Sequence, residues 1–391
     1  MLLIPFKTLK ATSIWILLLN LIIIKAQEGT HEDYRYIDTE PKLSAFKKYC
    51  ESDYLYSKYE PGYELDKVIL VFRHGDRTPT RTYNSAWKRE QCVVGESSLN
   101  THSISNFKYM NCENGDLTYK GYNQMSKLGY FIRNNYFSQL CQNTSDLNNC
   151  LKLRATHVKR THTSLNGVLY GMIGNSLDLD VEIPKSSLDA LLIPLQCRYL
   201  SSIISKEKDE FYKSVKTEYL NHKKKYSGHN ISDNYQTHIC NKIPVNCKEL
   251  SCDIDTIKDY MTSAEKTWES QSKTLQDESV LRFVFGRFAK RIKEILQEKE
   301  KMHIFAAHDG SITFLMSGLG IDSRVQPSYG ALLAIEIWKN HDKKYIKILY
   351  NGNPVQSTID KNSYISEEKF IKYLSVLEFD QEELSEKCKN I

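Results

Sequence analysis

The residues best suited to chemistry lie in one short segment, residues 73–79, with the sequence RHGDRTP. This segment places two guanidinium groups, Arg73 and Arg77, on either side of the imidazole of His74. Arginine offers a planar fork of hydrogen-bond donors that matches a phosphate, so the pair can hold a phosphoryl group from two sides. Neighbouring cations also lower the pKa of an imidazole, which keeps it neutral and nucleophilic. We therefore expect an oxyanion-binding loop in which His74 attacks phosphorus.

Two short apolar runs lead into the polar residues of interest. Residues 68–72 (VILVF) precede the loop just described, and residues 304–307 (IFAA) precede His308 and Asp309. Short apolar runs that stop abruptly at polar residues are typical of buried strands. In a sheet covered by helices, ligands bind at the carboxyl ends of the strands. The sequence therefore predicts that His74, His308 and Asp309 all lie at strand ends of this kind.

Helical periodicity separates these strands along the chain. Residues 118–136 place Tyr122, Met125, Leu128 and Ile132 at helical spacing, and a long polar and apolar alternation covers residues 264–301. We predict amphipathic helices over both stretches. Strands that alternate with helices indicate an α/β fold, here a central mixed sheet flanked by helices on both faces.

The 391 residues exceed what one hydrophobic core usually organises, and no Pro/Gly/Ser linker divides them. We therefore predict one domain over residues 27–391 that carries an insertion. Residues 197–273 are rich in lysine, tyrosine and cysteine and poor in strand-like runs. This composition favours a helical, disulfide-tied cap subdomain inserted over one side of the core.

The first 26 residues are interpreted as a targeting leader. They combine a basic start with an apolar stretch over residues 14–24 that is interrupted only by Asn20, and we predict cleavage after Ala26. This pattern is typical of a signal peptide, and an uncleaved signal anchor remains the alternative. Three positive charges of the net +5 lie in this leader, so the remaining chain is nearly neutral and nucleic acid is not an expected partner.

All ten cysteines follow the leader, and an even number in an oxidising compartment indicates disulfides. Cys240, Cys247 and Cys252 lack the CxxC pair of a zinc site, so we predict disulfides for this cluster too. Asn143 and Asn230 begin N-x-S/T triplets and are candidate glycosylation sites, in agreement with passage through the secretory pathway.

The pattern RHGxRxP in residues 73–79 resembles the signature of the histidine acid phosphatases, a branch of the histidine phosphatase superfamily. Residues 115–124 resemble the G-x-L-T-x-x-G-x-x-Q helix start of that family. Residues 154–161 place Arg160 where the family has its third phosphate arginine, and residues 308–309 match its His-Asp pair. The resemblance implies the phosphoglycerate mutase-like fold of these phosphatases.

The resemblance also implies roles that meet the needs of phosphomonoester hydrolysis: a nucleophile, positive charge around the phosphate and a proton donor. His74 is the nucleophile, and Asp309 protonates the leaving oxygen and then activates water. Phosphate is bound by four side chains, namely Arg73, Arg77, Arg160 and His308. Because Asp309 must begin protonated in a cationic site, we expect activity to favour acidic pH. The arginines replace a metal ion, so we expect neither a metal nor another cofactor, and no acidic cluster suited to a metal stands out.

Five further residues near these motifs receive weaker interpretations. We interpret His157, His162 and His303 as structural rather than catalytic, since single histidines are more often packed residues than participants. The hydroxyl groups of Thr78 and Thr163 could support the arginines by hydrogen bonds.

Within the family, residues 238–252, 331–338 and 346–351 resemble the 2-phosphoxylose phosphatases, which act on xylose in the glycosaminoglycan linkage region. That group implies a phosphorylated sugar of a proteoglycan linkage as substrate. It also implies a Golgi membrane protein, so the leader is an anchor if it is not cleaved. Otherwise a secreted protein, or one of the Golgi or lysosomal lumen, is expected.

Three alternatives differ in function. The first is a broad-specificity secreted acid phosphatase. The second is a mutase of the same superfamily, which the leader and the acid at Asp309 disfavour. The third is a non-catalytic lumenal binding protein, which is disfavoured because all six expected site residues are present.

Overall fold

The structure is a computed structural model that describes residues 33–55, 61–81, 87, 91–95, 107–141, 147–174, 179–185, 189–192, 197, 200, 228–379, 382, 386 and 388. The leader and Asn143 lie outside the described residues, as do residues 201–227 of the predicted cap.

The described chain alternates strands and helices. Its strands are β1 (Tyr34–Arg35), β2 (Glu64–Arg73), β3 (Gln91–Gly95), β4 (Phe107–Asn111), β5 (Leu151–Ala155), β6 (Val181–Glu182), β7 (Val245–Asn246), β8 (Met302–Ala307), β9 (Leu332–Asn340), β10 (Lys343–Tyr350), β11 (Asn353–Pro354) and β12 (Ile365–Ser366). Its α-helices are α2 (Tyr119–Ile132), α3 (Ser138–Leu140), α4 (Lys159–Ile173), α7 (Gly228–Asn241), α8 (Ile254–Thr274), α9 (Glu278–Gln297), α10 (Asp309–Gly318) and α11 (Glu367–Leu377). Short 3-10 or π-helical turns are η1 (Pro41–Tyr49), η4 (Arg133–Phe137) and η5 (Leu147–Asn149).

The main sheet has the strand order β11-β10-β9-β2-β8-β5-β6, with β12 beside β10. The pairs β2–β8, β8–β5 and β5–β6 are parallel, whereas β2–β9 and β9–β10 are antiparallel. The sheet is therefore mixed, as predicted. Its three neighbouring parallel strands β2, β8 and β5 end at the same edge.

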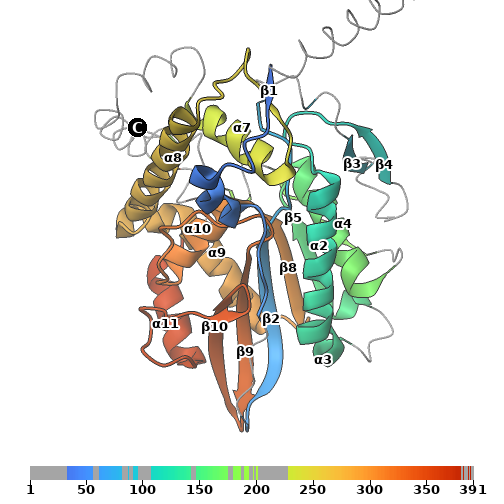
Figure 1. Cartoon of the computed structure of the whole chain (residues 1–391). Coiled ribbons are helices and arrows are strands. Elements are labelled where there is room, and N and C mark those ends of the chain that lie inside the picture. The colour runs from blue at the N-terminus through green and yellow to red at the C-terminus, as the bar shows by residue number, and fades with distance from the viewer. Residues whose placement is uncertain are drawn as a thin grey trace, which may run out of the picture.

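Helices cover both faces of the sheet, with α2 and α4 on one side and α9, α10 and α11 on the other (Figure 1). Successive residues of β2 point to opposite faces of the sheet. Leu70 and Phe72 pack towards α2 and α4, and Ile69 and Val71 pack towards α9. This alternation is the period of two that a strand imposes. The central strands are buried on both faces, which explains their nearly continuous apolar sequence.

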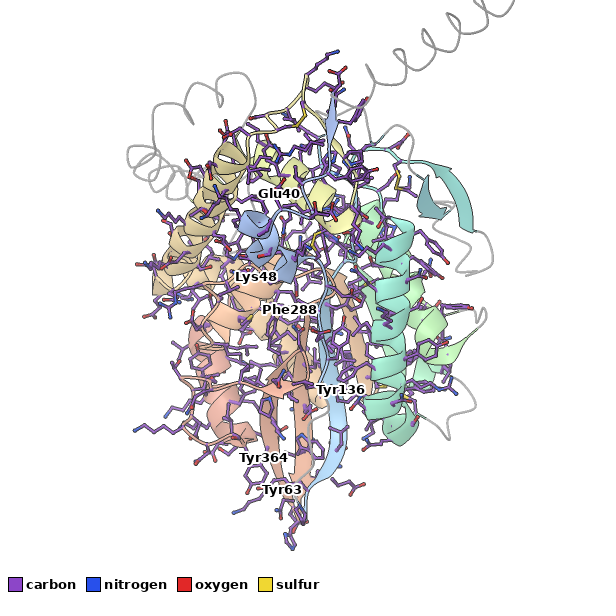
Figure 2. All side chains as sticks on the ribbon, in the orientation of Figure 1. Glu40, Lys48, Tyr63, Tyr136, Phe288 and Tyr364 are labelled. Carbon is purple, nitrogen blue, oxygen red and sulfur yellow. A yellow bond between two sulfur atoms is a disulfide. The ribbon has the colours of Figure 1, made fainter. Side chains whose placement is uncertain are left out.

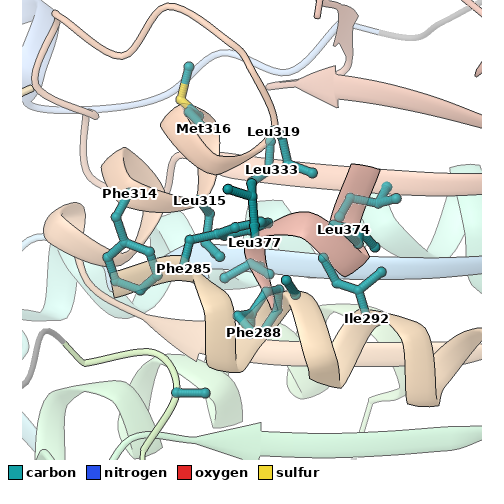
Figure 3. Close-up of a cluster of buried hydrophobic side chains, with 14 of the residues drawn as sticks. Phe285, Phe288, Ile292, Phe314, Leu315, Met316, Leu319, Leu333, Leu374 and Leu377 are labelled. Carbon is teal, nitrogen blue, oxygen red and sulfur yellow. The ribbon is translucent and has the colours of Figure 1, made fainter. Parts of the chain in front are cut away.

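The larger hydrophobic cluster joins α9, α10 and α11 to the sheet (Figure 3). Phe285 and Phe288 of α9 meet Phe314 of α10 and Leu377 of α11, all with 4% exposure or less. This packing fixes α10 against the sheet. Since α10 begins directly after β8, the same packing positions the residues at the β8–α10 junction.

At the lower end of the sheet, Tyr63 stacks on Tyr364 with ring centroids 4.2 Å apart (Figure 2). Further along the sheet, the buried carboxylate of Glu336 accepts hydrogen bonds from Tyr136 Oη and Trp338 Nε1, both at 2.9 Å. β2 starts at this lower end, so the carboxyl ends of the parallel strands lie at the opposite end, below α7 (Figure 1).

Residues 197–273, called the cap from here on, are mostly helical where the structure describes them and are tied by disulfides. The cap contains α7 and most of α8, and its own disulfide joins Cys247 to Cys252. The remaining disulfides are Cys50–Cys240, Cys92–Cys112, Cys141–Cys150 and Cys197–Cys388, so all ten cysteines are paired. Residues of η1 and its flanks share one hydrophobic cluster with α7 and α8. The cap is therefore packed on the N-terminal segment, a contact that the sequence did not predict.

The predicted helices exist with changed limits. The first, over residues 118–136, is α-helical only to Ile132 and continues as the π-helical turn η4. The second, over residues 264–301, is interrupted between α8 and α9 because the side chain of Asp277 accepts a hydrogen bond from Ser279 N and caps a new helix.

Candidate active site

The predicted site residues come together at the carboxyl ends of β2, β8 and β5. In the parallel registers, Arg73 lies opposite Ala307 on β8, and Ala306 lies opposite Ala155 on β5. The residues that follow each strand end therefore meet at one edge. These residues are His74, His308, Asp309 and, at the start of α4, Arg160.

His74 lies at the buried centre of this group, with 1% of its surface exposed. Its Nδ1 is 2.8 Å from the carbonyl oxygen of Gly75. A carbonyl can only accept, so Nδ1 carries the hydrogen and Nε2 carries the lone pair. Burial lowers the pKa of His74 well below its usual value, and the charges of Arg160, Arg73 and Arg77 lower it further. The side chain is therefore neutral and able to attack through Nε2.

Arg73 and Arg77 are both buried, and each has a carboxylate partner. Arg73 Nη2 lies 3.0 Å from Asp309 Oδ2, and the guanidinium packs 4.2 Å from the ring centroid of Tyr329. Arg77 forms a two-pronged pair with Asp233 through Nη1 at 3.2 Å and Nη2 at 2.9 Å. These pairs compensate two of the three positive charges around His74.

Arg160 and His308 form the more exposed side of the group. Burial, followed by the charge of Arg77, lowers the pKa of Arg160 to about 10. Arg160 Nη2 is 3.4 Å from His308 Nδ1, and His308 Nε2 is 2.9 Å from Thr156 Oγ1. Because a guanidinium only donates, His308 Nδ1 accepts and Nε2 donates. Burial and the charge of Arg160 lower the pKa of His308 to about 3, so this predicted phosphate ligand is neutral in the phosphate-free site.

Asp309 is the first residue of α10, and its Oδ1 accepts a hydrogen bond from Gly310 N at 2.8 Å. Burial alone raises the pKa of this carboxyl group, but Arg73 and Arg77 outweigh burial and lower it to about 2. The expectation that Asp309 begins protonated is therefore wrong for the phosphate-free site. The physical reason is that the cations predicted to bind phosphate also stabilise the carboxylate.

Residues 73–79, the phosphate loop from here on, pack directly on the start of α2. A Cβ atom on Gly75 would lie 2.4 Å from Gly121 O, so the loop and the helix both need glycine for this approach. Asp76 N donates to Gln124 Oε1 at 2.9 Å, and Thr118 Oγ1 donates to Asp76 Oδ1 at 2.7 Å. The G-x-L-T-x-x-G-x-x-Q segment therefore serves to hold the loop.

The structure also places the five further residues near the motifs. Thr78 supports Arg77 through its carbonyl, which accepts from Nη1 at 2.9 Å, while its hydroxyl group donates to Glu113 O at 2.6 Å. Thr163 Oγ1 donates within its own helix, to Lys159 O at 3.2 Å. Neither predicted hydroxyl contact with an arginine is therefore found among the described residues. His162 Nε2 lies 2.6 Å from Thr156 O and so supports the residue that contacts His308. His157 is exposed and His303 is buried within β8.

A profile of the histidine phosphatase superfamily (branch 2) matches residues 64–281, more than half of the chain. The chain belongs to this family. Membership confirms the family predicted from the motifs, and the chain is an acid phosphatase.

Relatives and solved structures agree with this membership. Proteins named 2-phosphoxylose phosphatase 1 from Xenopus tropicalis and Homo sapiens are each 23% identical, over 75% and 74% of this chain and over 69% and 65% of their own lengths. Hafnia alvei phytase in complex with tartrate superposes with a TM-score of 0.58 at 12% identity and covers 83% of this chain and 99% of its own. The phytase from D. castellii gives 0.56 at 14% identity and covers 88% of both chains. These structures confirm the predicted fold class.

Two residues of this family member's site escaped the sequence analysis. Asp233 lies 156 positions from Arg77 in a helix of the cap, and Tyr329 precedes β9. Tyr329 is 1% exposed and contacts both Arg73 and His74, with its ring centroid 5.9 Å from that of His74. Neither residue belongs to a local pattern, because tertiary packing alone brings them to the site.

Away from this site, the described residues include a group of possible metal ligands that the sequence did not single out. Glu298, Glu300 and His303 place one ligand atom each within 4.8 Å of one another. Arg291 pairs with Glu298, and Lys152 lies 3.6 Å from Glu300, so cations already accompany both carboxylates. A further cation is disfavoured there by charge, and we assign no chemistry to the group.

Proposed function

We propose that the phosphatase hydrolyses phosphate monoesters through a phosphohistidine formed on His74. The observation that carries this proposal is a buried, neutral imidazole, with its Nε2 lone pair available, among three arginines and an aspartate. In this arrangement Arg73, Arg77 and Arg160 bind the phosphate oxygens and stabilise their charge in the transition state. His74 Nε2 attacks phosphorus, and the ester oxygen leaves.

Asp309 is the proposed proton donor to the leaving oxygen and, after the alcohol departs, the base that activates water against the phosphohistidine. A bound phosphate dianion offsets the charges of Arg73 and Arg77, which are the groups that lower the pKa of Asp309 in the free site. Binding therefore raises this pKa. The required proton can enter with the substrate, because the dianion of a phosphate monoester takes up one proton near pH 6. Acidic pH favours the form that carries this proton.

His308 is proposed to direct Arg160 and to contact phosphate. In the free site, Nδ1 of its neutral ring accepts a hydrogen bond from Arg160 Nη2 and so orients the guanidinium. The negative charge of a bound phosphate raises the pKa of His308, so it can then donate to a phosphate oxygen.

For the substrate we propose a phosphorylated sugar of the proteoglycan linkage region. Support comes from the two relatives named 2-phosphoxylose phosphatase 1, each of which shares 23% identity with this chain. The alternative is a broad-specificity acid phosphatase.

For the compartment we propose the secretory pathway. Five disulfides indicate an oxidising, non-cytosolic compartment. In the described ranges, no helix is both long and apolar enough to cross a membrane. Within the secretory pathway, cleavage after Ala26 and glycosylation at Asn143 and Asn230 remain predictions.

Steady-state turnover of the purified protein tests the proposal. His74→Ala is expected to abolish hydrolysis, whereas His341→Asn, in the exposed turn between β9 and β10, is expected to leave it unchanged. EDTA is expected to have no effect. Full hydrolysis by His74→Ala, or loss of activity in EDTA, would show that the proposed mechanism is wrong.

A substrate comparison tests the specificity. The catalytic efficiency, kcat/KM, is measured for a 2-phosphorylated xyloside, phytate and a simple aryl phosphate. The proposal predicts the highest value for the xyloside. Equal values for all three would favour the broad-specificity alternative.

A further inference from the structure

The cap helix α7 supplies a carboxylate to the phosphate loop. Asp233 lies in the second turn of α7, and 13% of its side chain is exposed. Besides the two hydrogen bonds from Arg77, its Oδ2 accepts from the backbone N of Thr80 at 2.8 Å and from Thr80 Oγ1 at 3.0 Å. Two donors of one guanidinium bound to one carboxylate fix the plane of that guanidinium. Asp233 therefore sets both the orientation of Arg77 and the path of the chain after the loop.

The far end of α7 reaches the same loop by a second route. Cys240 forms a disulfide with Cys50, whose carbonyl oxygen accepts a hydrogen bond from Gln124 Nε2 at 2.7 Å. Gln124 Oε1 in turn accepts from Asp76 N at 2.9 Å. Asp233 and Cys240 are seven residues apart, so they lie on the same face of the helix. One face of α7 thus contacts the phosphate loop directly through Asp233 and indirectly through Cys240.

Catalysis depends on the direction of the Arg77 donors, not only on the charge. Phosphoryl transfer needs the three arginines to match the equatorial oxygens while His74 Nε2 stays in line with the leaving oxygen. Without Asp233, Arg77 keeps the hydrogen bond from Nη1 to Thr78 O but loses the two-pronged pair that fixes the guanidinium plane. Its charge then still attracts phosphate but no longer fixes the orientation of the phosphate. Binding of phosphate in the ground state is then retained, while stabilisation of the transition state is lost.

We propose that Asp233 is a positioning residue through which α7 orients Arg77, so that phosphoryl transfer depends on the docking of the cap. This inference rests on the proposed function of the phosphate loop. It adds a dependence on a helix that contributes no residue to the chemistry itself.

The first test compares Asp233→Ala with Asp255→Ala in the full protein. Asp255 is the matched control because it lies on α8 of the cap with 72% of its side chain exposed. Asp233→Ala is expected to lower kcat about 10- to 100-fold. Inorganic phosphate, measured by calorimetry, is expected to bind no more weakly than to the parent. An unchanged kcat, or a loss that appears only as weaker phosphate binding, would overturn the proposal. Asp233→Asn, which keeps the side-chain volume, replaces the alanine variant if that variant does not fold.

A second substitution, at Arg77, shows whether Asp233 positions Arg77 or has only a general structural role. Lysine cannot form the two-pronged pair, so Arg77→Lys already removes what Asp233 fixes. In the Arg77→Lys background, Asp233→Asn is expected to change kcat less than twofold. If the two substitutions multiply as independent effects, Asp233 does not act through Arg77 and the proposal is wrong.

The indirect contact of α7 with the loop, through the Cys50–Cys240 disulfide and Gln124, is tested by replacing both cysteines of a disulfide with serine. Removal of the Cys50–Cys240 disulfide is expected to lower kcat severalfold, whereas removal of Cys247–Cys252, which lies within the cap, is expected to leave it near the parent value. Equal effects of the two removals would contradict the indirect contact.

These experiments also distinguish this inference from the proposed function. If His74→Ala retains hydrolysis, the function itself is wrong. If His74→Ala is inactive and Asp233→Ala matches the parent, the function stands and the inference fails.

Discussion

The charge around His74 is organised by individual side chains rather than by net charge. The described part of the chain pairs Arg73 with Asp309 and Arg77 with Asp233, while Arg160 contacts the neutral ring of His308. Arg160 therefore offers an uncompensated charge to an incoming phosphate. The Gly75 carbonyl selects the tautomer that leaves the lone pair on Nε2 of His74, the proposed nucleophile.

The role of Asp309 leads to a leaving-group prediction. A proton donor matters most when the leaving alkoxide is strongly basic. Asp309→Asn is therefore expected to lower kcat about 10²- to 10⁴-fold with an alkyl phosphate and much less with p-nitrophenyl phosphate. The two substrates are compared under the same conditions, with the Asp255→Asn variant as control. Equal losses for both substrates would show that Asp309 does not protonate the leaving oxygen.

Much of the site could be predicted at the residue scale because its central residues are contiguous. Arg73, His74 and Arg77 share one loop, and His308 precedes Asp309 directly. The protonation state of Asp309 could not be predicted, since it depends on the 3.0 Å contact with Arg73. Asp233 was missed for a similar reason, because its pairing is made by folding and leaves no local pattern.

At the scale of elements, the phosphate loop depends on its contact with α2. An alanine Cβ at Gly121 would lie 2.0 Å from the carbonyl oxygen of Asp76. We expect Gly121→Ala to destabilise the protein by about 1–3 kcal/mol and to lower kcat/KM roughly 10²-fold. The exposed neighbour Asn123 provides the control, as Asn123→Ala should affect neither quantity by much. Urea denaturation and steady-state kinetics give both values. Parent-like activity in Gly121→Ala would mean that the loop does not need this close contact.

The sequence predicted the existence of elements better than their limits. Residues 68–72 identified the centre of β2, but the strand spans Glu64–Arg73 because pairing with β9 extends it. The break between α8 and α9 had a local signal in Asp277, a common capping residue, which the long periodic alternation obscured. No local pattern predicts the contact between the cap and the N-terminal segment, because the hydrophobic cluster there joins residues about 200 positions apart.

Buried histidines give the whole molecule a pH-dependent stability. Burial lowers the pKa of His238 and His303 to about 4. These groups stay neutral in the native state but take up protons below about pH 6.5 when unfolded, so the native state loses stability as the pH falls from 6.5 towards 4. Asp76 acts in the opposite direction, because burial raises its pKa to about 6.

This balance predicts that the free energy of unfolding is lower at pH 4.5 than at pH 7. Each such histidine contributes at most about 1.4 kcal/mol per pH unit to the difference. His303→Leu removes a buried ring whose two nitrogens have no hydrogen-bond partner among the described residues, and it should reduce the difference, whereas His341→Asn should not. Urea denaturation at the two pH values measures this quantity. The same difference in His303→Leu and the parent would contradict the assignment.

Trapping the intermediate tests most directly whether phosphate is transferred to His74. The purified protein is mixed with a ³²P-labelled phosphomonoester and quenched within milliseconds in alkaline denaturant, where a phosphorus–nitrogen bond survives, and the labelled peptide is identified by mass spectrometry. Transfer to His74 predicts label on His74, none in His74→Ala, and longer-lived label in Asp309→Asn. Turnover by the parent with no labelled protein, or with label on another residue, would contradict it.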